Sequence, residues 1–188
     1  MPPGGISTIA LQVQKVGQLF DTLDPLPFRE RDLDREAEEY IVSWARELPH
    51  SDVLRIEVHM PPAEAQSEQA RILGQAMRRY FLYRAEITAG ELKELFRRGR
   101  FSLVIGLAVL AACLAITRFL NATLQQGQLN TFLGEGLIIL GWVANWRPIE
   151  IFLYDWWPLV RRHRLFQRLA SAEVVVRTGD QISEADSP

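Results

Sequence analysis

The chain has 188 residues, 48% of them hydrophobic, and its 21 Lys and Arg against 23 Asp and Glu give a formal net charge of −2. This is about the length of one domain. The hydrophobic content excludes a disordered chain, and the near-neutral charge lacks the basic footprint of nucleic-acid-binding proteins, so we expect no nucleic-acid partner. The single cysteine, Cys113, excludes an internal disulfide and a cysteine-based zinc site.

Two strands and an amphipathic helix are predicted in the first sixty residues. Apolar residues alternate with other residues over 9–13 and again over 54–60, which is the period of half-buried strands. Between them, Asp32 is placed to cap a helix, and a connection of this length favours a parallel strand pair joined by a crossover helix. One face of this helix carries Leu33, Ala37, Tyr40, Ile41, Trp44 and Leu48.

A long helix is expected to follow the second strand, which Pro61 and Pro62 end. It would run directly into the first apolar stretch through 97–100, with Gly90 and Gly99 as the points where it could bend. Its apolar face consists of Ala70, Leu73, Met77, Tyr80, Phe81, Ile87, Leu92, Leu95 and Phe96.

Residues 101–117, FSLVIGLAVLAACLAIT, contain no charge. A helix over 101–120 would be about 30 Å long, the thickness of the hydrocarbon core of a bilayer, so we predict a first transmembrane span there. The alternative is a buried helix of a soluble protein. Small residues at spacings of three and four would let another helix approach closely. They are Ala108, Ala111, Ala112 and Ala115.

The second apolar stretch, 132–160, reads FLGEGLIILGWVANWRPIEIFLYDWWPLV. We predict a second span over about 133–157, because apolar residues continue beyond Arg147 and the pair Trp156–Trp157 makes an interfacial belt. A re-entrant or surface-lying helix is the alternative, since buried charges are costly and Pro148 removes a backbone donor.

Basic residues flank both stretches and are missing from the connector 121–131, NATLQQGQLNT. By the positive-inside rule, both termini of a multi-pass membrane protein would be cytoplasmic and the connector would lie outside. No basic segment followed by an apolar run occurs at the N-terminus, so we expect no cleaved signal peptide. The flanking residues that are candidates for contact with lipid headgroups are Arg97, Arg98, Arg100, Arg161, Arg162 and Arg164.

These patterns predict an α+β membrane protein. Residues 1–98 would form a small cytoplasmic α/β domain that includes the long helix, 99–160 a transmembrane helical hairpin, and 161–188 a cytoplasmic segment with a polar tail. A short third strand is predicted over 174–176. If it adds to the sheet, the hairpin is an insertion within the cytoplasmic domain.

Charged residues inside the apolar stretches are the first candidates for function, because an intramembrane charge is costly unless it has a partner or a task. Folding the hairpin with Leu120 opposite Phe132 puts Arg118 level with Glu135 and Asp155 level with 97–98, which predicts an ion pair at each rim. The five charges are Arg118, Glu135, Arg147, Glu150 and Asp155.

Arg147 and Glu150 lie three residues apart, and their level on the first span is uncharged. One interpretation is a pair that satisfies itself near the cytoplasmic interface. The other places both residues on the inner face of an oligomer, where they would hold an anionic group or a lipid headgroup, or relay protons. Asn145 and the break at Pro148 would support the second interpretation, because Pro148 frees a backbone carbonyl.

No catalytic, metal or cofactor site is predicted. The acidic residues of 21–34 are explained by Asp-Pro turns and a helix cap. His50, His59 and His163 are scattered and match no zinc or triad pattern. We therefore expect no cofactor.

Two stretches, LFDTLDPLPFRERDLDREAEEYIVSWARE (19–47) and GLIILGWVANWRPIEIFLYDWWP (136–158), resemble an uncharacterised family of bacterial two-span membrane proteins with a cytoplasmic α/β portion. Together with the joining helix, these stretches cover most of the chain. The resemblance implies a bacterial origin and the two-span topology, and it implies no activity.

The leading functional hypothesis is a non-enzymatic inner-membrane protein that acts as an interaction or assembly module. Its expected partners are membrane lipid and either further copies of itself or another membrane protein. The alternative is an oligomeric channel or transporter component that uses Arg147 and Glu150. A third hypothesis is a membrane-bound enzyme acting on lipids, for which Glu150 and Asp155 are the only candidate acids.

Overall fold

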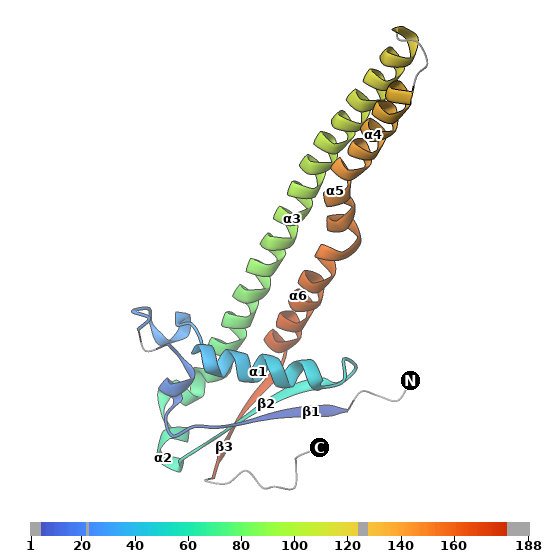
Figure 1. Cartoon of the computed structure of the whole chain (residues 1–188). Helices are drawn as coiled ribbons and strands as arrows, with labels where there is room; N and C mark the ends of the chain where they lie inside the picture. Colours follow the sequence, from blue (N-terminus) through green and yellow to red (C-terminus); the bar gives the residue numbers. More distant parts are fainter. Residues whose placement is uncertain (1–4, 22, 124–127, 180–188) are drawn as a thin grey trace. The chain divides into compact units, whose positions relative to one another are not determined.

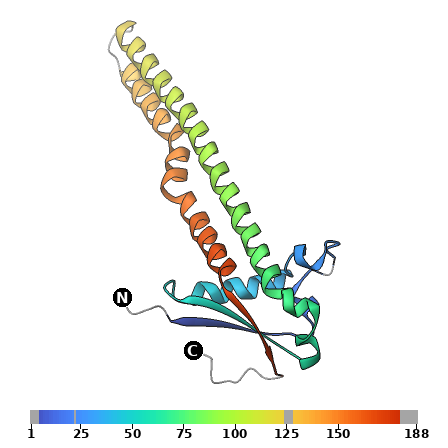
Figure 2. The ribbon, with the colours of Figure 1, turned by 180° about the vertical axis from the view of Figure 1, so that it is seen from behind.

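The computed structural model describes residues 5–21, 23–123 and 128–179 (Figures 1 and 2). The chain divides into two compact units. The first combines Met1–Ile87 with Arg162–Pro188, and the second is the intervening segment Thr88–Arg161. We refer to the first as the sheet unit and to the second as the helical hairpin.

The sheet unit is built on three parallel strands, β1 (Ile6–Gln12), β2 (Val53–Met60) and β3 (Glu173–Thr178), in the order β1-β2-β3. All three predicted strands are confirmed, and so is the parallel pairing of the first two. Because β3 pairs with β2, one folded unit is assembled from two pieces of chain that lie on either side of the hairpin.

The two faces of the sheet differ in polarity, as alternation with a period of two requires. One face of β2 is charged, where Arg55 lies 2.9 Å from Glu173 and Glu57 lies 3.4 Å from Arg177. The other face packs on α1 (Arg35–Glu47) and on parts of α3 (Glu68–Thr123) and α6 (Trp156–Ala170). The core there includes Ile41, Ala45, Leu54, Ile56, Val58, Met60, Leu73, Met77, Phe81, Phe166 and Leu169.

Helix α1 forms the crossover between β1 and β2, as expected, after two short 3-10 turns, η1 (Val16–Leu19) and η2 (Phe28–Glu30). Its cap is Asp34, whose side chain accepts hydrogen bonds from two backbone N–H groups of the first turn. The prediction of Asp32 as the cap is therefore wrong. Leu33 forms a β-bridge with Phe20, which keeps this segment extended until Asp34.

The long helix begins later than predicted. Pro61 and Pro62 open a separate short helix, α2 (Pro62–Ala65), and α3 starts only after it. Ser67 caps α3, since its hydroxyl accepts a hydrogen bond from the N–H of Ala70. From there α3 continues through Gly90 and Gly99 without interruption. The predicted apolar face is buried at Ala70, Leu73, Met77, Tyr80 and Phe81, whereas Ile87 is 36% exposed.

The helical hairpin pairs the later part of α3 with α4 (Gln128–Ala144), α5 (Trp146–Glu150) and the π-helical turn η3 (Ile151–Asp155), which leads into α6 (Figures 1 and 2). The two sides run antiparallel. Gly134 faces Thr117, Gly141 faces Leu110, and Asn145 faces Gly106. This register is within one residue of the register that the sequence predicts.

A seam of small residues spaced seven apart joins the two sides of the hairpin. A Cβ atom added to Gly106 would lie 2.9 Å from the carbonyl oxygen of Ala144, and one added to Gly141 would lie 3.3 Å from the Cα of Leu110. Glycine therefore allows the two backbones to approach closely. The buried members of the seam are Gly99, Gly106 and Cys113 on α3, and Gly134, Gly141 and Pro148 on the opposite side.

The alanine stripe that the sequence suggested as a contact surface lies elsewhere. Its four members, Ala108, Ala111, Ala112 and Ala115, are exposed on α3. The closest packing follows the seven-residue repeat of the seam instead, because glycine at positions 106 and 141 leaves room for the opposing backbone.

Asn145 forms a polar link across the seam. Its side chain is 7% exposed, and its amide nitrogen donates to the carbonyl oxygens of Gly106 at 3.0 Å and of Gly141 at 2.9 Å. Because α4 ends just before Asn145, this residue joins α3 to the place where the opposing helix is interrupted. Such a bond is specific to one register, since a shift of either helix would leave a buried amide without a partner.

We predict that Gly106→Ala lowers the free energy of unfolding by about 1–3 kcal/mol, because its methyl group would overlap the backbone of Ala144 and the side chain of Asn145. Chemical unfolding followed by circular dichroism measures the effect. Gly90→Ala is the matched control on the same helix, since no atom lies within 4 Å of its Cβ position. The control should gain up to about 1 kcal/mol of stability from helix propensity. An equal loss of unfolding free energy in both variants would contradict the close packing of the two backbones at Gly106.

Candidate functional site

The hairpin charges predicted as candidates form one cluster on the α5–η3 side. Arg147 Nη1 lies 2.8 Å from Glu150 Oε2, which confirms that these two residues pair, and Arg147 Nη2 lies 3.5 Å from Asp155 Oδ2. The predicted pairing of Asp155 with Arg97 or Arg98 is therefore wrong. The π-helical turn η3 takes about one residue more than an α-helical turn, which brings Asp155 onto the face of Arg147 two turns away.

Arg97 and Arg98 pair locally instead. Both bind Glu94, at 2.6 Å and 3.0 Å, from positions three and four residues later in α3. The hydrogen bond from Arg98, then that from Arg97, lowers the pKa of the Glu94 carboxyl below its usual value. The other predicted rim pair is also not formed, since no ion pair among the described residues joins Arg118 to Glu135. Both side chains are exposed.

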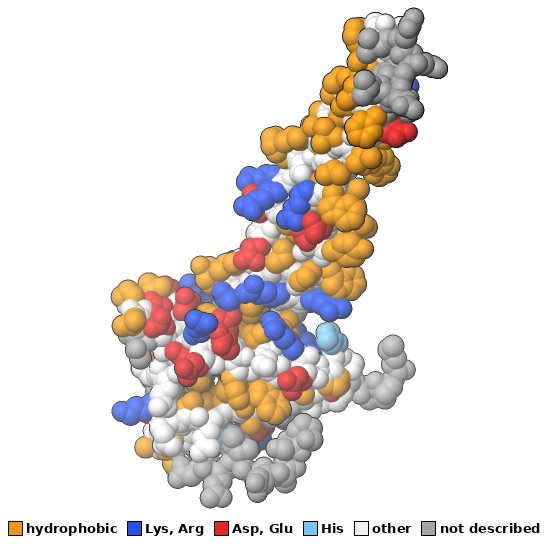
Figure 3. All heavy atoms as spheres, viewed as in Figure 1, with side chains coloured by type: hydrophobic (Ala, Val, Ile, Leu, Met, Phe, Trp, Pro, Cys, Tyr) orange, Lys and Arg blue, Asp and Glu red, His pale blue; other side chains and the backbone are white. Residues whose placement is uncertain are grey.

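The Arg147 cluster lies on an otherwise apolar surface. The side chain of Arg147 is 63% exposed and that of Glu150 43% exposed. In Figure 3, hydrophobic side chains cover most of the visible face of the hairpin, and a group of charged side chains interrupts them. Apolar residues exposed on the same helices include Trp142, Val143, Trp146, Ile149, Leu153, Tyr154 and Trp157.

The predicted headgroup contacts divide into two groups. Arg100 and Arg164 are exposed, and Arg161 places its guanidinium 5.3 Å from the ring centroid of Trp157. Arg162 instead turns to Phe166 in the sheet unit, 5.6 Å from the ring centroid. It lines a cavity that the sequence did not predict.

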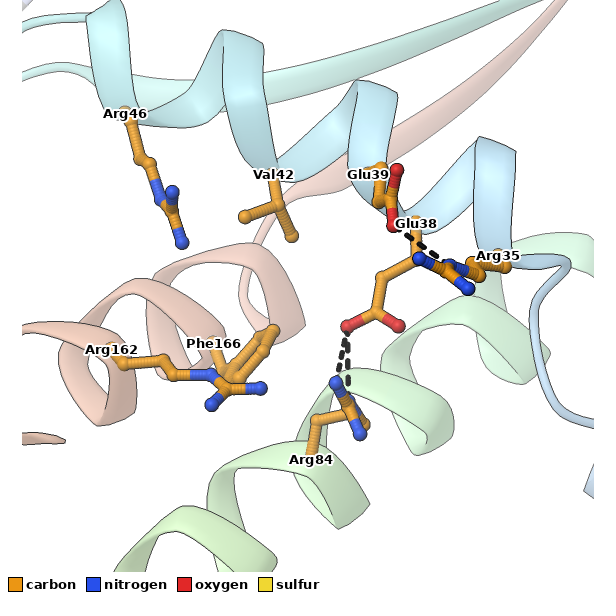
Figure 4. Close-up of a pocket in the computed structure, with 8 residues that line it drawn as sticks. All are labelled: Arg35, Glu38, Glu39, Val42, Arg46, Arg84, Arg162 and Phe166. Carbon is orange, nitrogen blue, oxygen red and sulfur yellow. Dashed lines mark hydrogen bonds and ion pairs between the residues drawn. The ribbon is translucent and has the colours of Figure 1, made fainter.

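This cavity, which we name the arginine pocket, has a volume of about 420 Å³ (Figure 4). Helix α1 supplies most of its wall, from residues whose spacing puts them on one helical face. Helix α3 adds Arg84, and α6 adds Arg162 and Phe166. The complete lining is Arg35, Glu38, Glu39, Val42, Arg46, Arg84, Arg162 and Phe166.

Phe166 organises the arginines of the pocket. Its ring is 1% exposed, and the guanidinium carbons of Arg84 and Arg162 lie 5.4 Å and 5.6 Å from its centroid. Both distances are within the range of cation–π attraction. The aromatic ring therefore holds two cations at the wall of one cavity.

The two carboxylates of the pocket are already bound by protein groups. Glu38 is 2.7 Å from Arg84 and accepts a hydrogen bond from the hydroxyl of Tyr80, also at 2.7 Å. Burial, followed by the hydrogen bond to Glu38, raises the pKa of the Tyr80 hydroxyl strongly. Glu39 accepts from Arg35 at 2.9 Å. Arg46 and Arg162 have no ion-pair partner among the residues that the structure describes.

Of the residues that line this pocket, only Arg162 is a candidate from the sequence, as a contact for lipid headgroups. The spacing of Arg35, Glu39 and Arg46 on a predicted helix shows which face they share, but nothing local shows what that face meets. Arg84 and Arg162 come together because α6 packs beside α3 in the sheet unit, where Phe166 stacks on Phe81 at 6.4 Å and the His163 ring lies 2.9 Å from the carbonyl oxygen of Ala85. That is a long-range contact without a sequence signature.

A second, smaller cavity of about 260 Å³ lies near the turn before α1, on the other side of Tyr80. Burial, followed by the charge of Asp24, raises the pKa of the Asp32 carboxyl there. The cavity is lined by Leu26, Glu30, Arg31, Asp32, Arg79, Tyr80 and Tyr83. Within 5–21, 23–123 and 128–179, no group of three or more His, Cys, Asp or Glu side chains is arranged to hold a metal ion.

Comparisons with known proteins match no family model, no curated protein and no solved structure.

We predict that Tyr80→Phe lowers the free energy of unfolding by about 1–2 kcal/mol at pH 7, because Glu38 loses a hydrogen bond. A raised pKa in the folded state contributes stability that is present below the unfolded pKa of about 10 and is lost as the pH rises above it. The wild type should therefore lose stability faster than Tyr80→Phe above pH 10, and the gap between their free energies of unfolding should narrow. Urea unfolding of both proteins from pH 7 to 11 measures this; a constant gap would contradict it.

Proposed function

We propose that this protein is anchored in the bacterial inner membrane by its helical hairpin and that the sheet unit is a non-enzymatic binding module on the cytoplasmic side. The observation that supports this most directly is the distribution of side chains in the hairpin. Large apolar side chains point outward, and small or polar side chains point inward. A hairpin in water would have the opposite arrangement, because water favours burial of the large apolar groups.

Two helical segments, in Glu68–Thr123 and Phe132–Ala170, are long and apolar enough to cross a membrane. Only 11% of the most apolar 18-residue window in the first is buried, and 22% in the second. A core helix of a soluble protein would be mostly buried, so this exposure argues against the soluble alternative. Among the exposed residues, Phe101, Val104, Phe119, Phe132, Ile139 and Trp142 are each at least 63% accessible.

The second segment supports a full crossing rather than a re-entrant turn. Gly134, Gly141 and Asn145 contact α3 in an unbroken antiparallel register, and Phe152 continues it by stacking on Phe96 at 6.1 Å. A re-entrant segment would reverse direction part of the way along. At the interruption, the Asn145 side chain donates a hydrogen bond to the carbonyl oxygen of Gly106 in α3. Polar groups inside a membrane require such partners within the protein.

The orientation follows from the basic flanks, which the positive-inside rule assigns to the cytoplasm. Both termini would then be cytoplasmic, in agreement with the resemblance to two-span bacterial membrane proteins. The arginine pocket belongs to the sheet unit and would face the cytoplasm. Partners of the module would be lipid and either a second copy of the chain or another membrane protein.

Cysteine labelling tests this topology in bacterial spheroplasts. In a Cys113→Ala background, Thr123→Cys at the end of α3 should react with a membrane-impermeant maleimide in intact spheroplasts. Ser171→Cys, in the sheet unit after α6, should react only after lysis. The natural Cys113, which is 4% exposed in the seam, should stay unlabelled until the protein is denatured.

Labelling of both engineered cysteines in intact spheroplasts would overturn the orientation. Recovery of the wild-type chain in the supernatant after alkaline carbonate extraction would overturn the anchor itself.

The Arg147 cluster is the one observation that favours a second candidate, an oligomer whose hairpins line a pathway. A lipid-facing charge cluster is costly, and contact with further copies would shield it. We expect a structural role, because Arg147 is bound by two carboxylates of its own chain.

Accordingly, Arg147→Gln should destabilise the hairpin by about 2 kcal/mol, since it leaves two carboxylates without a cation. The double variant Arg147→Gln/Glu150→Gln should recover part of that loss. Unfolding in detergent micelles gives the stability, and flux per molecule in reconstituted vesicles should be the same in all variants. A loss of flux at normal stability would favour the pathway instead.

A further inference from the structure

We infer that the arginine pocket binds a phosphate-bearing anion through Arg46 and Arg162, with Arg84 held beside them. The proposal concerns a site in the sheet unit and goes beyond membrane anchoring. It depends on the charge balance of the pocket, on the way the arginines are held, and on the size of the cavity.

The charge balance leaves the pocket cationic. Four arginines and two glutamates line it, which gives a formal charge of +2. Glu39 is paired with Arg35, and Glu38 is bound by Arg84 and Tyr80. Arg46 and Arg162 have no carboxylate partner in the described part of the chain. A phosphate monoester carries about −1.5 to −2 charges at pH 7, which matches the surplus.

Two of the arginines, Arg84 and Arg162, are positioned before any ligand arrives. Figure 4 shows the Arg46 side chain reaching from α1 toward the part of the pocket where Arg162 lies over Phe166. The guanidinium carbons of Arg84 and Arg162 lie 5.4 Å and 5.6 Å from the centroid of the Phe166 ring, and the bond to Glu38 fixes Arg84 further. A guanidinium fork matches the oxygens of a phosphate in a bidentate manner, which a lysine cannot reproduce.

The cavity has room for more than the phosphate group. Its volume of about 420 Å³ falls within the usual range for small-molecule sites. Val42 and Phe166 line the cavity beside the cations, so its wall is not formed by charged residues alone. Two sources supply such a group: a soluble phosphate monoester, or the phosphate of an anionic lipid, whose headgroup region Arg162 would approach five residues after Trp157.

Isothermal titration calorimetry on the full chain in uncharged detergent tests the proposal. One arm titrates inorganic phosphate and glycerol 3-phosphate. The other titrates mixed micelles that contain short-chain phosphatidic acid, with phosphatidylcholine micelles as the blank. We expect saturable binding in at least one arm, weakened by added salt. The arm that responds identifies the source, and the soluble arm does not depend on the membrane proposal.

The pocket variant is Arg46→Gln/Arg162→Gln, and it should weaken binding at least about tenfold, because two charge-assisted contacts are lost. The matched control is Arg71→Gln/Arg78→Gln, which removes the same two charges from exposed positions on α3 outside the pocket. It should change the affinity less than about threefold. The single variant Arg46→Gln is expected to fold normally and covers the case in which the double variant misfolds, since Arg46 has no ion-pair partner among the described residues.

Three results would overturn the proposal. They are the absence of binding in both arms at millimolar probe, an equal loss of affinity in the pocket and control variants, and full affinity in a folded Arg46→Gln/Arg162→Gln protein. If phosphate binding is not observed but cysteine labelling still shows a membrane-inserted protein, only the binding proposal is overturned. If the protein is not anchored in the membrane but still binds phosphate, only the anchoring proposal is overturned.

Discussion

The close approach of two antiparallel helix backbones is the constraint on which the hairpin depends. At Gly106 and Gly141 the opposing chain leaves no room for a side chain, and Asn145 bonds to the carbonyl oxygens that this contact exposes. With small residues turned inward, the large apolar side chains must point outward. Packing, and not burial of apolar surface, holds the two sides together, which suits a lipid environment better than water.

The hairpin is inserted into the sheet unit, and this insertion also creates the arginine pocket. Arg84 comes from the piece of chain before the hairpin, whereas Arg162 and Phe166 come from the piece after it. The third strand returns the chain to the sheet, where Val174 and Val176 pack against the core that includes Phe166. The proposed ligand site and the proposed anchor are thus consequences of one chain path, although they belong to different compact units.

Among the described residues, the charged residues of the hairpin pair with neighbours in the same helix and not with residues across the hairpin. Arg97 and Arg98 bind Glu94, and Arg147 binds Glu150, all at spacings of three or four residues in one helix. Pairs this close in sequence are held together by the helix itself, so they form at little cost in conformational entropy. The cross-hairpin pairs expected at the rims require long side chains to meet across a seam that is filled by the helix backbones. A nearly correct register was therefore not enough to show whether these ion pairs form.

The sequence by itself determined the elements and their order, because periodicity of two and of 3.6 residues is a local property. Three strands, the crossover helix and the two long apolar stretches follow from it, and folding the hairpin about its connector predicts the register to within one residue. Helix starts were less predictable, since Asp34 and Ser67 take over as caps where backbone pairing and prolines hold the preceding residues. Only the tertiary structure decided which small residues form the seam and which arginines share a pocket. Both depend on faces that meet across long stretches of chain, and no local pattern records which face a helix will present to its neighbour.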